Sequence, residues 1–172
     1  DKDSNLVSRN RPVALVVNAC TSLASHLIEY LLEKNIQVIA LDDLSISEKK
    51  NLEEVSKSKD FHLLNLPIDN DIVLDKFSRL DLPRLDYAFF ITDKNVADVI
   101  LGRGIVNFIT VASDFKKGKD EKSVEHNGRP RLVFSSSINL YGRELSSKDR
   151  IIKEAEAKFA RGIKHFKLNG RV

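Results

Sequence analysis

The sequence predicts an α/β fold in which flanking helices cover a doubly wound parallel sheet of about six strands. Short apolar runs alternate with segments of helical periodicity from Pro12 to the end of the chain. The length of 172 residues suits one domain with a sizeable core. A composition of 42% hydrophobic and 31% charged residues is that of a globular protein and excludes a disordered chain.

Six short apolar runs have the length and composition of parallel strands that are buried on both faces. In chain order they are residues 13–17, 36–41, 61–68, 87–91, 132–134 and 165–168. The second and third runs are separated by a stretch without a clear apolar repeat. The other intervals carry helical patterns, which complete the alternation.

Helical spacing is clearest after the first strand. There, apolar residues recur three or four positions apart at Leu23, Leu27, Ile28 and Leu31. Similar patterns cover residues 72–80, 96–112 and 151–159. The polar segment 116–130 is predicted to be a hydrated loop rather than a phosphate-binding patch, because its lysines are interleaved with Asp and Glu. The alternation is typical of Rossmann-like domains, which bind ligands beyond the carboxyl ends of their strands.

Charge and residue counts exclude several classes of partner. A formal net charge of +3 is too balanced to indicate nucleic acid or an anionic membrane, and no apolar run approaches the roughly 18 residues of a spanning helix. The four histidines have no metal-ligand spacing. A single cysteine, Cys20, is consistent with a reducing compartment, so we expect a cytoplasmic protein.

Domain boundaries follow from the same patterns. We assign residues 1–11 to a polar N-terminal tail and residues 12–172 to one Rossmann-like dinucleotide-binding domain. The sequence contains no methionine, so we expect it to be part of a longer protein.

The first strand is followed by Asn18-Ala19-Cys20-Thr21-Ser22-Leu23-Ala24-Ser25-His26-Leu27. A loop at this position normally binds pyrophosphate and uses glycines to turn tightly and to bring backbone N–H groups to the phosphate. This loop contains no glycine. A helix N-terminus would lower the pKa of the Cys20 thiol, although an inert loop residue is the favoured interpretation.

The segment resembles that of the extended short-chain dehydrogenase/reductases, the NAD-dependent nucleotide-sugar epimerases and dehydratases, whose stretch reads roughly TGGAGFIGSHL. The three fingerprint glycines fall on Asn18, Thr21 and Ala24. Asn tolerates a left-handed backbone and Ala is accepted at the third position, whereas Thr21 would either intrude on the phosphate or replace a main-chain contact with its hydroxyl. The resemblance implies that the cofactor contacts of this loop are Asn18, Thr21, Ser22, Leu23 and Ala24.

The second strand ends in Leu41-Asp42-Asp43-Leu44-Ser45, which is similar to the family's LDNLS. The resemblance implies that Asp42, with Asp43 beside it, binds the adenosine ribose and favours NAD over NADP, because a carboxylate disfavours a 2′-phosphate. Without the resemblance, an Asp that caps the next turn is an equally good interpretation.

Other family positions are altered. In the family, an Asp that contacts adenine stands where this sequence has Pro67, and a His stands where it has Phe90. Thr92-Asp93 replaces two small residues that lie beside the cofactor in the family.

The segment from Leu132 to Gly142 is similar to the family's FSSSxxxYG. The resemblance implies that Ser137 positions the substrate. Alternatively, these serines satisfy backbone groups at a strand end. No lysine after Tyr141 has a tyrosine four residues before it, so the family's Tyr-x-x-x-Lys base is missing.

Two functions remain open from the sequence. The first is the NAD-binding domain of a nucleotide-sugar epimerase or dehydratase relative, with the sugar-binding C-terminal domain absent from these residues. The second is a catalytically dead Rossmann domain, a pseudoenzyme that serves as a structural or protein-interaction module, either as a homo-oligomer or with another protein.

Overall fold

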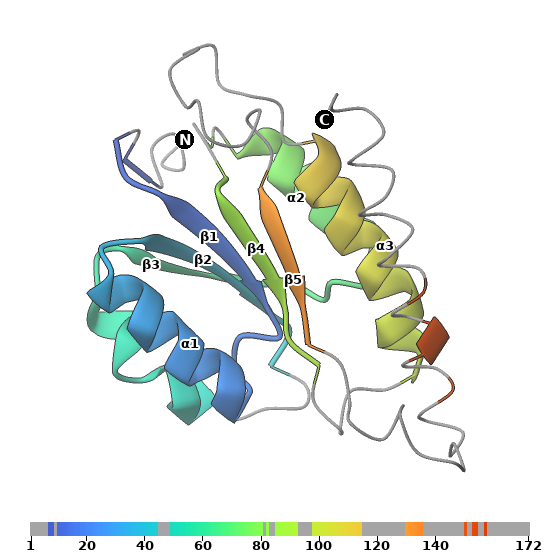
Figure 1. Cartoon of the computed structure of the whole chain (residues 1–172), viewed down its shortest axis with the longest axis horizontal. Helices are drawn as coiled ribbons and strands as arrows, with labels where there is room; N and C mark the ends of the chain where they lie inside the picture. Colours follow the sequence, from blue (N-terminus) through green and yellow to red (C-terminus); the bar gives the residue numbers. More distant parts are fainter. Residues whose placement is uncertain are drawn as a thin grey trace.

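The computed structural model describes residues 7–8, 10–44, 49–80, 82, 85–92, 98–114 and 130–135, together with positions 150, 153, 154 and 157. Within them, five parallel strands form one sheet in the order β3-β2-β1-β4-β5 (Figure 1). The strands are β1 Val13–Val17, β2 Gln37–Asp42, β3 Phe61–Asn65, β4 Tyr87–Phe90 and β5 Arg131–Phe134. The order reverses beside β1, which makes the sheet doubly wound as predicted.

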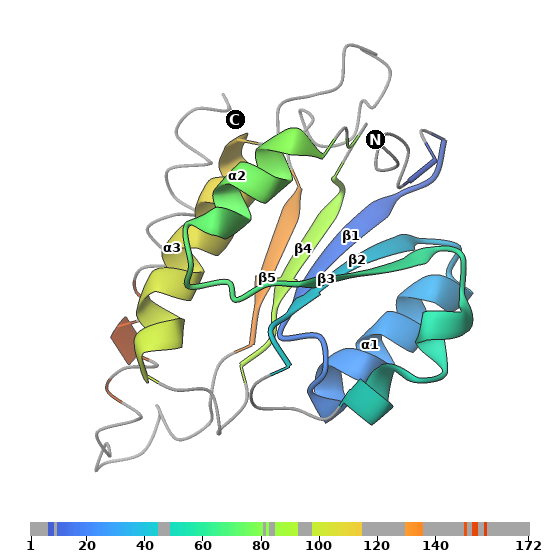
Figure 2. The same ribbon diagram turned by 180° about the vertical axis from the view of Figure 1, so that it is seen from behind.

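Helices cover both faces of the sheet, as the views from the front and from behind show (Figures 1 and 2). One face carries α1 Ser22–Glu33 and the short 3-10 turns η1 Lys49–Leu52 and η2 Val55–Lys57. The other face carries α2 Ile72–Arg79 and α3 Asp98–Asp114. Every residue of β1 and β2 is buried because both faces are covered.

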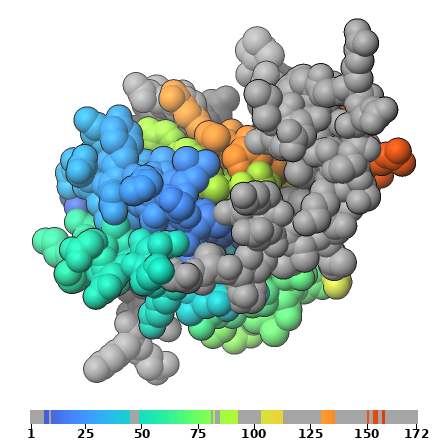
Figure 3. Space-filling model, turned by 90° about the horizontal axis from the view of Figure 1, so that it is seen from below, coloured from blue at the N-terminus to red at the C-terminus, as the bar shows by residue number. Residues whose placement is uncertain are grey.

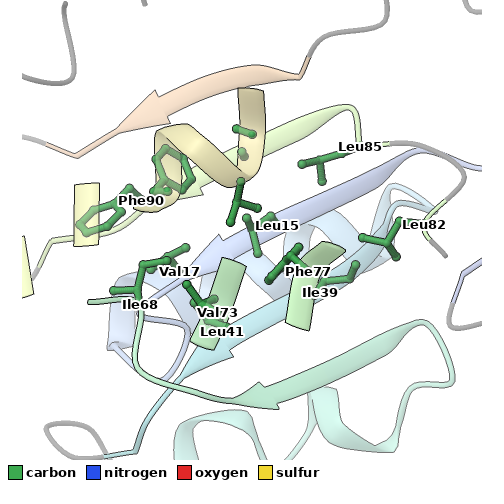
Figure 4. Packing of buried hydrophobic residues seen from close by; sticks show 14 of the residues in the cluster. Leu15, Val17, Ile39, Leu41, Ile68, Val73, Phe77, Leu82, Leu85 and Phe90 are labelled. Carbon is green, nitrogen blue, oxygen red and sulfur yellow. The ribbon is translucent and has the colours of Figure 1, made fainter. Parts of the chain in front are cut away.

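Alternate residues of the strands belong to two separate core clusters, because side chains point to opposite faces of a sheet in turn. Leu15, Val17, Ile39 and Leu41 pack toward α2 and α3, where Figure 4 shows them beside Val73 and Phe77. The opposite cluster contains Ala14, Val16, Val38 and Ala40 with Ala24 and Ile28 of α1.

Five of the six predicted strands are confirmed: β1 has the predicted ends, and the other four are shifted at one or both ends. The run predicted over 61–68 stops as a strand at Asn65; two residues later Pro67 lacks the N–H that a ladder requires. The predicted strand 165–168 and the polar segment 116–129 lie outside the described residues. Of the C-terminal helix, positions 150, 153, 154 and 157 are described and are helical.

The described residues before Pro12 contact the sheet. Val7 is 7% exposed and belongs to the core. The Ser8 N–H donates to the Gln37 side chain (2.6 Å), whose Nε2 donates back to the Ser8 carbonyl (3.0 Å). Arg11 forms an ion pair with Asp60 and donates to Asn35. No helix in the described part of the chain is long and apolar enough to cross a membrane.

Candidate functional site

The β1–α1 loop lies where the first two strands end, next to the carboxyl end of β4. Asn18 has a φ of 59°, in the left-handed region that a glycine would otherwise supply. Its N–H donates to the Leu41 carbonyl (2.9 Å), and its side-chain Nδ2 donates to the Ile91 carbonyl (2.7 Å). Asn18 therefore makes the turn without glycine and connects β1 with the ends of β2 and β4.

Thr21 is the N-cap of α1. Its Oγ1 accepts a hydrogen bond from the Ala24 N–H (3.3 Å) and donates to the Asn18 carbonyl (3.1 Å). The residue is 5% exposed. The hydroxyl is therefore directed into the end of the helix, where it caps α1.

Most backbone N–H groups of the loop have acceptors within the protein. Those of Ala19, Cys20 and Thr21 donate to Leu41, Asp42 and Asn18. Among the described residues, the N–H groups of Ser22 and Leu23 have no hydrogen-bond partner, and both residues are exposed. These two amides, at the positive end of α1, are the ones that can receive a phosphate.

Asp42 closes β2 and ties it to the loop. Its Oδ2 accepts from the Cys20 N–H (2.8 Å) and its Oδ1 from the Leu44 N–H (2.7 Å). The second bond is the turn-capping interaction that the sequence left open as an alternative. Each carboxylate oxygen has a second lone-pair site, so the group retains capacity to accept from a ligand hydroxyl.

Cys20 is a residue of this loop and is fully buried. Burial, together with the charge and hydrogen bond of Asp42, raises the pKa of its thiol to about 12. This raised pKa agrees with the inert loop residue that the sequence favoured, rather than with a thiol activated by the helix N-terminus. The thiol is protonated at neutral pH and is not a nucleophile.

A solvent-open hollow of about 270 Å³ lies at the carboxyl ends of β1, β2 and β3. It is lined by Asn18, Leu41, Asp42, Asp43, Leu66, Pro67, Ile68 and Asp69. Three of these residues carry carboxylates. In Figure 3, which views the molecule from below, residues of the β1–α1 segment (blue) and of the segment after β2 (teal) form adjoining parts of this side.

Two residues of α3 hold the wall of the hollow in place, and sequence reasoning missed both. The buried Asn107 donates from Nδ2 to the Ile68 carbonyl (2.9 Å). Gly104 lies so close that a Cβ would be 2.9 Å from Cγ2 of Ile68. Gly104 and Asn107 are three residues apart and share one face of a mainly apolar helix, which is the signal that could have identified them. Asp69, two residues beyond Pro67, was missed as well.

The ends of β4 and β5 are joined by Thr92 and Ser135. The Thr92 N–H donates to Ser135 Oγ (2.5 Å), its Oγ1 donates to the Ser135 carbonyl (2.7 Å), and the two hydroxyls are 2.9 Å apart. Ser137, the predicted substrate-positioning residue, lies outside the described residues. Within the described ranges, no group of His, Cys, Asp or Glu could hold a metal ion.

The structure is similar to solved nucleotide-sugar epimerases and dehydratases. The dTDP-glucose 4,6-dehydratase of Bacillus anthracis, in complex with NAD, gives a TM-score of 0.71 over 90% of this chain at 14% identity. UDP-glucose 4-epimerase of Thermotoga maritima, with UDP-glucose, gives 0.67 over 88% at 15% identity. WbmH of Bordetella bronchiseptica, in complex with NAD+, gives 0.67 over 89% at 14% identity.

At these identities the likeness establishes a shared fold, and the Rossmann-like architecture that the sequence resemblance implies is confirmed. The chain covers 51%, 51% and 53% of those three structures, so it spans about half of their length. No protein-family model and no curated protein matches the sequence.

Proposed function

We propose that the chain is the NAD-binding domain of a protein that resembles the nucleotide-sugar epimerases and dehydratases. The observation that carries the proposal is the combination of three features at one edge of the sheet. These are the left-handed turn at Asn18, the two amides of Ser22 and Leu23 at the start of α1, and the carboxylate of Asp42 beside the hollow.

The three features correspond to the parts of a dinucleotide. The amides at the helix N-terminus suit the pyrophosphate, and a carboxylate at the end of the second strand suits the ribose hydroxyls. Asp42, Asp43 and Asp69 all line the hollow. Their negative charge disfavours the 2′-phosphate of NADP, so the proposed cofactor is NAD.

Calorimetric titration of the full chain with NADH and with NADPH tests the proposal. We expect NADH to bind with a Kd on the order of micromolar, and NADPH to bind more weakly by about tenfold or more. A denatured sample is first checked for nucleotide carried through purification. Absence of binding with both nucleotides, in a folded sample free of carried-over nucleotide, contradicts the proposal.

The contribution of Asp42 is measured with Asp42→Asn, whose amide oxygen can still accept one of the two backbone bonds. We expect weaker NADH binding and a smaller difference between NADH and NADPH, because the variant lacks the charge. Asp75→Asn, on the exposed surface of α2, is the matched control and should leave both affinities unchanged. If Asp42→Asn binds NADH as the parent does, Asp42 is only a turn residue.

The second candidate function is a Rossmann domain that serves as a structural or protein-interaction module without turnover. The occupied amides of Ala19, Cys20 and Thr21 favour it, because a phosphate-binding loop normally directs its N–H groups at the ligand. We propose that the described residues alone do not support turnover. A nucleotide sugar is the substrate class proposed for the longer protein.

A further inference from the structure

Asn51 is a residue of η1 whose side chain contacts the β1–α1 loop. Its Nδ2 donates to the Cys20 carbonyl (2.7 Å), across 31 positions of the sequence. The neighbouring Leu52 is 2% exposed and belongs to the core cluster that contains Ala24 and Ile28 of α1. In Figures 1 and 2 the teal turns after β2 lie beside α1. The core contact of Leu52 therefore fixes η1 against α1 and holds the Asn51 carboxamide at the loop.

Side chains from outside the loop hold Cys20 at both of its backbone polar groups. Asp42 Oδ2 accepts from the Cys20 N–H (2.8 Å), and Asn51 donates to the Cys20 carbonyl. A glycine-rich loop turns through backbone torsions that other residues avoid. This loop contains no glycine, and side chains of β2 and η1 contribute to fixing its path.

Thr21 passes this restraint from Cys20 to the start of α1. Its N–H donates to the Asn18 carbonyl (3.3 Å), and its carbonyl accepts from the Ser25 N–H (2.9 Å). The C=O and the N–H of a trans peptide unit point in opposite directions. Because the Thr21 carbonyl is turned into the helix, the Ser22 N–H points out of the helix end.

The next peptide unit is fixed in the same way. The Ser25 hydroxyl donates to the Ser22 carbonyl (2.9 Å), so the Leu23 N–H also points out of the helix end. Both N–H groups lack a hydrogen-bond partner among the described residues. Their directions depend in turn on the preceding peptide unit of the loop, whose carbonyl accepts from Asn51.

We propose that Asn51 is a positioning residue for the pyrophosphate of the proposed cofactor. The inference rests on the proposed function and adds to it a residue that acts through the Cys20 carbonyl. Asn51 keeps the N–H groups of Ser22 and Leu23 directed at the diphosphate. Amides that are held in place before the ligand arrives bind it without the entropic cost of ordering the loop.

Calorimetric titration of NADH into variants of the full chain tests the inference. Asn51→Ala removes the donor, and Asn51→Leu removes it while keeping a branched side chain of similar shape. We expect NADH to bind about tenfold more weakly to both variants, because the apparent Kd rises as the fraction of molecules with a binding-competent loop falls. Each titration is made where circular dichroism shows the variant to be folded.

Val55→Ala is the matched control. Val55 lies in η2, is 5% exposed and belongs to the same core cluster as Leu52. Its truncation leaves a cavity that should lower the urea midpoint, and the affinity for NADH should stay unchanged. If Asn51 had a merely structural role, its variants would behave as this control does, with a lower midpoint and an unchanged affinity.

Two-dimensional NMR of the ligand-free proteins provides a second readout. We expect the amide signals of Ser22 and Leu23 to move in Asn51→Ala and to stay in place in Val55→Ala. Unchanged signals in Asn51→Ala, or parent-like NADH affinity in either folded Asn51 variant, overturn the inference and leave the proposed function standing. Absence of NADH binding by the parent removes both.

Discussion

Three substitutions at the fingerprint positions have distinct physical consequences in this structure. Asn18 keeps the left-handed turn, and Ala24 is fully buried under the loop. Thr21 departs furthest from glycine, and its hydroxyl has become the cap of α1. The sequence allowed the first two outcomes to be anticipated, because they depend on the residue type alone. The cap depends on where the hydroxyl points, which the sequence does not specify.

The cap predicts a specific change in stability. Thr21→Ala leaves the Ala24 N–H without its acceptor and should lower the free energy of unfolding by about 1 kcal/mol. Thr21→Ser retains an acceptor and should remain close to the parent. Urea denaturation monitored by circular dichroism measures both values. Equal stability of the Ala variant and the parent would show that the hydroxyl does not cap the helix.

At the scale of elements, α3 sets the position of the segment that follows β3. Gly104 allows α3 to approach Ile68 closely, and Asn107 holds the carbonyl of the same residue. The helix was predicted from its apolar spacing, and its existence is confirmed. Its two contacts with the hollow could not be predicted, because they depend on how closely two distant segments approach each other.

Gly104→Ala should destabilise the protein although alanine is the better helix former. The added Cβ would be 2.9 Å from Cγ2 of Ile68 and 3.5 Å from the Phe90 ring. Overpacking of this kind costs about 1–3 kcal/mol, more than the 0.5–1 kcal/mol that alanine gains over glycine in a helix. A lower urea midpoint is the expected result. A higher urea midpoint would contradict this expectation, because it would show that α3 and Ile68 move apart readily enough to accommodate the added methyl group.

The segment before β1 is also joined to the sheet by an ion pair. The hydrogen bond from Arg11 holds the pKa of the Asp60 carboxyl below its ordinary value. Because the folded-state pKa is lowered, the pair stabilises the fold above about pH 4 and loses this contribution as the pH falls through the lowered pKa.

Asp60→Asn should therefore be less stable than the parent at pH 7, and the difference should shrink in acid. Denaturation at pH 7 and at about pH 3 measures it, with the exposed Asp75→Asn as the control, since surface pairs contribute little. A difference that stays constant between the two pH values would contradict the role of this ion pair.

At the scale of the whole molecule, the alternation of strands and helices was sufficient to predict the doubly wound sheet. Buried parallel strands have continuous apolar runs, and amphipathic helices have a different period, so the two kinds of element can be separated in the sequence. The site was predicted less completely. Asn18 and Asp42 were singled out in the sequence and line the hollow. Asp69, which also lines it, and Asn107, which holds the carbonyl of Ile68, were not singled out, because their places beside the hollow arise from the fold.

The central claim is that NADH binds where β1 and β2 end, at the start of α1. Two-dimensional NMR of the isotope-labelled chain during NADH titration tests this most directly. We expect the amide signals of Ser22, Leu23 and Asp43 to shift in a saturable way, while those of Lys34 and Asn35 after the far end of α1 stay in place. Unchanged signals at Ser22, Leu23 and Asp43 at millimolar NADH would contradict the account.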